Sequence, residues 1–173
     1  TDRTLTLPDS AGTIATTNGI TGADTWRLTS NISLTSAGAD QITSNWERDD
    51  TYSPALIGSG MSESSGVFTF PETGIWLIQA WIYYEGNSSR YTGAIIRVSV
   101  DGSTPSLNGA YVYNSQGGTS YQATPFVSYV FDVTNTSTHK VMLRYEQAST
   151  SNTIQGTTDT NATAIQFIRL GDT

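Results

Sequence analysis

The acidic side chains that could bind a cation gather in one short segment, WERDD, at residues 46–50. Glu47, Asp49 and Asp50 supply the oxygen ligands that Ca²⁺ prefers. The segment lacks the further ligands at fixed spacing that an EF-hand loop requires, and Arg48 could neutralise the carboxylates instead. We predict no cofactor and no bound metal, and these three carboxylates are the one calcium candidate.

The chain has few of the residues that acid–base or nucleophilic catalysis requires. Its single histidine, His139, lies in the segment TNTSTHK, which we expect to be an exposed turn, and no serine lies in a Gly-x-Ser-x-Gly elbow. The absence of cysteine excludes disulfides, thiolate nucleophiles, iron–sulfur clusters and thiolate zinc sites. We therefore predict that the protein is not an enzyme.

The composition favours one domain with a neutral polar surface. The chain has 173 residues, and 15 acidic against 8 basic side chains give a formal net charge of −7, without the basic stripe that nucleic-acid binding needs. No apolar run approaches the roughly 18 to 20 residues of a membrane-spanning helix, so we expect no membrane insertion. The chain starts without Met or a signal-peptide pattern, and we expect it to be part of a longer polypeptide.

The elements that must position any site are expected to be strands. Helical periodicity is absent, and Gly, Asn, Pro and Ser/Thr clusters interrupt the chain every 8 to 15 residues or so, which indicates an all-β domain. Asp101-Gly102 predicts a hairpin, and we expect residues 125–133 to pair with 140–146. The expected strands are 26–32, 45–48, 75–84, 94–100, 110–113, 125–133, 140–146 and 162–170.

Residues 66–78, GVFTFPETGIWLI, carry a family resemblance. A glycine and an aromatic residue are followed by Pro-x-x-Gly-x-aromatic-x-aliphatic and a long strand, which resembles the signature of complement-one-q and tumour-necrosis-factor-like jelly rolls. The resemblance covers roughly residues 45–171, and only the last strand departs from it, since Ile168, Arg169 and Leu170 follow Phe167. It implies an antiparallel jelly-roll sandwich that assembles as a homotrimer.

A second resemblance lies in residues 4–20, TLTLPDSAGTIATTNGI. This segment is similar to one that recurs in bacteriophage tail-fibre and other virion appendage proteins, ahead of a C-terminal head. It implies that residues 1–24 form an arm or shaft end that binds other virion proteins, and that residues 25–173 form the head. The protein would be made in the host cytoplasm and reside in the virion. The expected attachment residues are Leu5, Leu7, Pro8 and Ile14.

The longest strand, 75–84, is apolar on both faces. A sandwich strand ordinarily alternates between a core face and a wet face, so this strand needs a second cover. The tumour-necrosis-factor-like architecture supplies one by packing the inner sheet against two neighbours, although a loop or the N-terminal arm could cover the face in a monomer. The residues expected in the trimer interface or the core are Trp81, Tyr83, Tyr129, Phe131 and Phe167.

Antiparallel strands would place both termini at the base of the head and the loops 49–63, 85–92, 114–121 and 148–160 at the tip. Aromatic faces, amides and hydroxyls in these loops suit recognition of sugars. The expected receptor-binding residues are Asn87, Arg90, Tyr91, Tyr113, Gln116, Tyr121 and Gln155.

Together these features predict the trimeric receptor-binding tip of a phage tail fibre, which attaches to a host surface glycan or protein. The alternative is a capsid decoration or head-fibre protein that binds and stabilises the shell through its N-terminal arm. A depolymerase with paired carboxylates is a third, less favoured function, because such enzymes usually have longer β-helical bodies.

Overall fold

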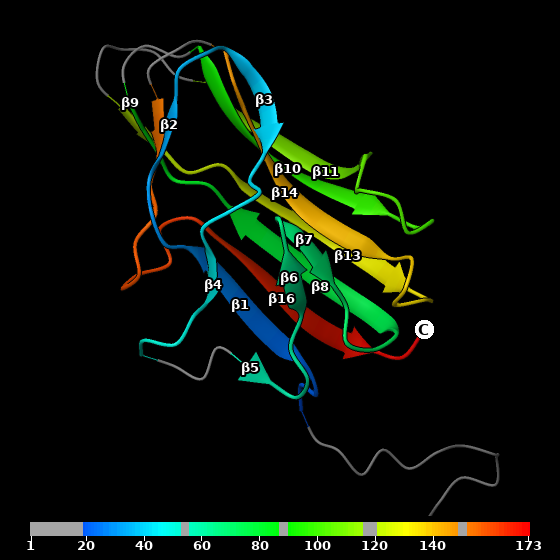
Figure 1. Cartoon of the computed structure of the whole chain (residues 1–173). Coiled ribbons are helices and arrows are strands. Elements are labelled where there is room, and N and C mark those ends of the chain that lie inside the picture. Colours follow the sequence, from blue (N-terminus) through cyan, green and yellow to red (C-terminus); the bar gives the residue numbers. More distant parts are fainter. Residues whose placement is uncertain (1–18, 53–55, 87–89, 116–120, 149–151) are drawn as a thin grey trace, which may run out of the picture.

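A computed structural model describes residues 19–52, 56–86, 90–115, 121–148 and 152–173 (Figure 1). Every regular element in this part of the chain is a strand, and all pairings are antiparallel, as the sequence predicts. The strands are β1 (Ala23–Leu28), β2 (Ile32–Leu34), β3 (Gly38–Gln41), β4 (Trp46–Arg48), β5 (Leu56–Ile57), β6 (Ser62–Ser64), β7 (Val67–Thr69), β8 (Gly74–Trp81), β9 (Tyr84–Gly86), β10 (Tyr91–Ser99), β11 (Leu107–Ser115), β12 (Tyr121–Ala123), β13 (Phe126–Val133), β14 (Lys140–Gln147), β15 (Asn152–Ile154) and β16 (Ala164–Gly171). The described residues hold no helix that is long and apolar enough to cross a membrane.

The strands form three sheets. The β8 sheet has the order β13-β8-β16-β1-β4, with β5 also paired to β1. The β10 sheet has the order β11-β10-β14-β7-β6, with β3 paired to β14. The small sheet, β12-β9-β15-β2, lies at one end of the molecule, away from the C-terminus (Figure 1).

The core lies between the β8 and β10 sheets and is rich in aromatic rings. Phe68 contacts Phe167 with ring centroids 5.2 Å apart, and Phe70 contacts Trp76 at 5.3 Å. Three of these rings come from the segment 66–78. Gly74 in the same segment has a φ of +144° and lies against the backbone of Gly171, where a side chain would collide. Residues 66–78 therefore supply three aromatic rings of the core and the glycine that lets β8 lie close to the end of β16.

Strand β8 has the two faces that its sequence predicts. Trp76, Ile78 and Ala80 point into the core and are at most 1% exposed, whereas Leu77 and Trp81 are half-buried on the outward face. The neighbouring β13 alternates in the same way, with alternate residues from Val127 inward. Outward side chains of the β8 sheet therefore include large apolar groups.

The predicted pairing of 125–133 with 140–146 is wrong, because β13 pairs with β8 and β14 pairs with β10. The turn between them carries the chain from one sheet to the other, and the carbonyl of Asn135 accepts hydrogen bonds from the backbone N–H groups of Thr138 and His139. The expected exposure of His139 is also wrong. The residue is 8% exposed, and its ring lies 5.3 Å from the ring of the core residue Phe131.

The hairpin at Asp101-Gly102 is confirmed, since it joins the paired strands β10 and β11. Gly102 has a φ of +85°, which the turn requires. The Asp101 carboxylate accepts hydrogen bonds from the Ser99 hydroxyl, 2.9 Å away, and from the Ser103 backbone N–H, 3.0 Å away. This strand pair contributes the face on which the candidate site lies.

The first and last described strands begin and end close together. Ala23 pairs with Ile168, and the Arg169 N–H donates to the carbonyl of Gly22. The prediction that 49–63 is a tip loop is wrong, because Ile57 in β5 pairs with Ala23 at this same end. Strand β4 runs antiparallel to β1 and returns the chain to the base. The predicted boundary at residue 24 stays a prediction, since residues 1–18 lie outside the described part.

Candidate ligand-binding site

The candidate site begins with a row of three residues across the β10 sheet. Gly93 in β10 lies opposite Tyr113 in β11 and opposite Glu146 in β14. Residues that lie opposite each other share a face of the sheet. A Cβ atom on Gly93 would lie 2.5 Å from the Tyr113 ring, so the missing side chain makes room for that ring to cross β10 toward Glu146.

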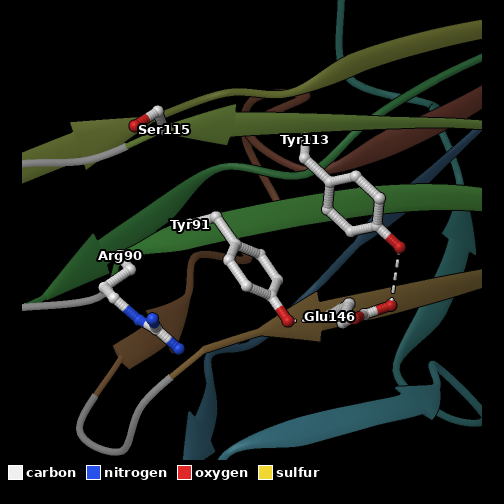
Figure 2. Close-up of a pocket in the computed structure, with 5 residues that line it drawn as sticks. All are labelled: Arg90, Tyr91, Tyr113, Ser115 and Glu146. Atoms are coloured by element: carbon white, nitrogen blue, oxygen red, sulfur yellow. Dashed lines mark hydrogen bonds between the residues drawn. The ribbon is translucent and has the colours of Figure 1, made fainter.

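Two tyrosine hydroxyls hold the Glu146 carboxylate from different sides, as Figure 2 shows. The Tyr113 hydroxyl donates to Oε2 at 2.8 Å, and the Tyr91 hydroxyl donates to Oε1 at 3.2 Å. The two rings meet edge to face with centroids 5.3 Å apart. The rings of Tyr91 and Tyr113 together form an aromatic wall, and the Glu146 carboxylate lies at the edge that carries their hydroxyl groups.

The two phenols remain hydrogen-bond donors well above neutral pH. Burial, followed by the hydrogen bond to Glu146, raises the pKa of Tyr113 to about 12. The hydrogen bond to Glu146 is the main cause that raises the pKa of Tyr91 above its ordinary value. Both phenols therefore stay protonated over the physiological pH range and donate to Glu146 throughout it.

These side chains line a pocket of about 520 Å³, bounded by Arg90, Tyr91, Tyr113, Ser115 and Glu146 (Figure 2). A second pocket of about 560 Å³ lies at the end of β11, bounded by Tyr113, Asn114, Ser115, Tyr121, Gln122, Ala123 and Thr124. Tyr113 and Ser115 line both. The two hollows are therefore adjacent and together form one concave surface.

A chain of hydrogen bonds holds Tyr121, which lines the second pocket. The Tyr121 hydroxyl donates to Oδ1 of Asn152, and Nδ2 of Asn152 donates to Oε1 of Gln147, each at 2.6 Å. Gln147 in turn donates to the Ser36 carbonyl at 2.6 Å. Asn152 and Gln147 are each 1% exposed, and a fully bonded buried network holds its members in one geometry. Tyr121 is thus fixed before any ligand arrives.

The structure brings together part of the predicted receptor-binding set. Arg90, Tyr91 and Tyr113 line the first pocket, and Tyr121 lines the second. Gln155 lines neither, because its amide donates to Glu85 at 2.9 Å in the small sheet. Asn87 and Gln116 lie outside the described residues, as do Leu5, Leu7, Pro8 and Ile14 of the predicted attachment arm.

Sequence reasoning missed Glu146 and Ser115. One signal for the site was available, since Gly93 lies among strand-forming residues between Tyr91 and Ile95, and a glycine inside a strand often marks a close approach. The identity of the groups that approach it depends on the β10–β14 register, which the incorrect pairing of 140–146 concealed.

The three carboxylates of the calcium candidate bind an arginine in the structure. Glu47, Asp49 and Asp50 do lie close together, but they surround the guanidinium of Arg27, which is 1% exposed and lies 2.9 Å from Asp49 and 2.7 Å from Asp50. Arg48 pairs with Asp24 instead, at 2.9 Å. Among the described residues, no group of three or more acidic or histidine side chains has an arrangement that could hold a metal ion.

Of the residues predicted for the trimer interface or the core, some lie in the core and the others lie outside it. Phe131 and Phe167 are buried in the core, and Tyr129 packs against it. Trp81 is half-buried on the outward face of β8, where its indole N–H donates to the Asn161 carbonyl at 2.8 Å, and Tyr83 is also half-buried.

Comparison with known proteins identifies the architecture. No family model and no curated protein matches the chain. Among solved structures, Eiger TNF from S. frugiperda aligns with a TM-score of 0.61 and 10% identity over 87% of this chain and 93% of that one. Murine APRIL aligns with a TM-score of 0.61 and 11% identity over 86% of this chain and 98% of that one. The chain has a tumour-necrosis-factor-like jelly-roll fold. The fold implied by residues 66–78 is therefore confirmed.

The outward face of the β8 sheet in this jelly roll carries an apolar row. The row has one residue from each of five adjacent strands, and each residue pairs with the next across the sheet. In the order β13, β8, β16, β1 and β5, these residues are Val130, Leu77, Ile168, Ala23 and Ile57. Val130 is 54% exposed and Ile57 is 45% exposed. A continuous apolar row that is partly exposed to solvent marks a surface that is suited to burial against another molecule.

Proposed function

We propose that this protein is a non-enzymatic homotrimeric binding head that attaches a bacteriophage tail fibre to a glycan or protein on the host surface. Two features of the jelly roll support the proposal: an apolar row on its β8 sheet and a concave surface at the end away from its termini. The first suits self-association, and the second suits recognition.

The need to cover the apolar row supports a trimer. In the tumour-necrosis-factor-like architecture, the inner sheet of each protomer packs against two neighbours around a threefold axis. The apolar row defined by Val130, Leu77, Ile168, Ala23 and Ile57 lies on the corresponding open face, with Phe126 beside Trp81 in a further apolar pair. Burial of apolar surface contributes about 25 cal/mol per Å², which favours association.

The positions of the termini support attachment at the pocket end. Ala23 and Ile168 pair at the base, so the chain that precedes residue 23 leaves from the end opposite the small sheet (Figure 1). We assign the N-terminal arm that precedes β1 to contacts with other virion proteins, because residues 4–20 resemble a segment of phage appendages. The pockets would then face away from the particle.

The three copies of the concave surface in one trimer would bind the host surface multivalently. Once one protomer is bound, the other two sites are held at a high effective concentration near the same surface, which raises avidity without any new contact. Weak single-site affinity therefore suffices for stable attachment.

The test locates the protein on intact particles with an antibody against this chain and electron microscopy. Label at the tail tips, and inhibition of particle adsorption by the free head, would support the proposal. Label distributed over the shell would contradict it and favour the capsid-decoration alternative, in which residues 1–24 bind the shell.

A further inference from the structure

We infer that the pocket formed by Tyr91, Tyr113 and Glu146 binds an uncharged sugar ring, whose hydroxyl groups donate to the Glu146 carboxylate. This inference rests on the proposed function, which leaves open whether the receptor is a glycan or a protein, and it names the class of ligand. The carboxylate, the charge balance and the aromatic wall each support it.

The carboxylate of Glu146 has unused acceptor capacity. A carboxylate offers about four lone-pair sites, and the two phenols occupy one site on each oxygen. Each oxygen can therefore accept one more hydrogen bond, and two neighbouring hydroxyls of one ring supply two donors. The phenols also fix the carboxylate, so the ligand does not have to order it.

The charges of the pocket disfavour ionic ligands. Glu146 and Arg90 both line it, so it holds one group of each sign. An acidic sugar would meet the carboxylate of Glu146 as well as the net charge of −7 of the chain. An ammonium ligand would meet the guanidinium of Arg90. A neutral polyol instead donates to Glu146 and accepts from Arg90.

The wall offers an apolar surface to the C–H face of a sugar ring. Tyr113 is 42% exposed although its hydroxyl is bonded, so part of its ring faces solvent. The Tyr91 ring stands edge-on to it at an interplanar angle of 81°. The volume of about 520 Å³ lies within the range of about 300 to 1,000 Å³ that is typical of small-molecule sites.

The experiment titrates the full chain with methyl glycosides of glucose, galactose, mannose and N-acetylglucosamine, and follows ligand protons by saturation-transfer NMR. N-acetylneuraminic acid and choline are the acidic and cationic probes. The test variants are Glu146→Gln, which removes the charge, and Gly93→Ala, whose Cβ displaces the Tyr113 ring. The matched control is Glu85→Gln, because Glu85 is also bonded by two side chains but lines neither pocket.

We expect at least one neutral glycoside to bind, with at least tenfold weaker binding to both test variants and unchanged binding to the control. Circular dichroism of each variant shows whether it is folded. Binding of the acidic probe or choline alone, or neutral binding that survives both test changes, would overturn the inference. Particles that adsorb through the head although no glycoside binds would overturn the sugar pocket only. Sugar binding by a protein that is located on the shell would overturn the proposed function only.

Discussion

The ring of Tyr113 lies over Gly93, within 2.5 Å of where a side chain on Gly93 would begin. This contact lets the Tyr113 hydroxyl reach Glu146 on the next strand. We predict that Gly93→Ala displaces the ring and lowers the pKa of Tyr113 from about 12 toward its ordinary value of about 10. Tyrosinate absorbance followed through an alkaline titration measures this change, and Tyr113→Phe identifies the titration step. An unchanged titration of Gly93→Ala would show that Gly93 does not control the ring.

The raised tyrosine pKa values predict alkaline destabilisation. Between about pH 10 and 12, Tyr113 loses its proton in the unfolded chain but keeps it in the folded chain. The unfolded state is then favoured, so the free energy of unfolding falls as pH rises through this window. Burial raises the pKa of Tyr84 as well, and its hydroxyl donates to the Gly93 carbonyl at 2.7 Å. Urea unfolding at several pH values should show a shallower decline for Tyr113→Phe than for the original chain. Equal slopes would contradict the prediction.

Arg27 is the buried cation among three carboxylates, so its removal should cost stability. Arg27→Met leaves Glu47, Asp49 and Asp50 close together without their partner. We predict a loss of about 2 kcal/mol in the free energy of unfolding at neutral pH, because the largely buried Asp49 carboxylate loses its charged hydrogen-bond partner. Arg90→Met, at an exposed position, is the control and should change stability by less than about 0.5 kcal/mol. Equal effects of the two changes would refute this role of Arg27.

Much of the fold could be predicted from local patterns. The alternation in 75–84 separates a core face from an outward apolar face, and Asp101-Gly102 identifies a hairpin, because both signals depend on neighbouring residues alone. The partner of each strand was harder to predict. Residues 134–139 look like a hairpin turn, yet they cross between sheets, and only the packed structure decides between these arrangements.

Only part of the candidate site could be predicted, because the rest depends on which strands pair. Tyr91 and Tyr113 are conspicuous as aromatic residues beside expected loops, whereas Glu146 enters the site only through the β10–β14 register. Arg27 likewise reaches the acidic segment because β1 pairs with β4, which places Arg27 opposite Glu47. Sequence alone favoured the adjacent Arg48, whose partner in the structure is Asp24.

The apolar row on the β8 sheet gives a mutational test of assembly. Leu77 is half-buried on the outward face, so Leu77→Glu leaves the core untouched but places a charge in the proposed interface. We predict a folded monomer with unchanged circular dichroism. Tyr111→Glu, at a 61% exposed position on the β10 sheet, is the matched control and should remain trimeric. A Leu77→Glu variant that assembles like the original chain would place the interface elsewhere.

Self-association through the β8 sheet is tested best by the mass of the original chain in solution, measured by sedimentation equilibrium at micromolar concentration. We predict a single species of three chains, each of 18.6 kDa, or about 56 kDa in total. A stable species of 18.6 kDa at that concentration would contradict it, because the outward face of the β8 sheet would then be exposed without a partner.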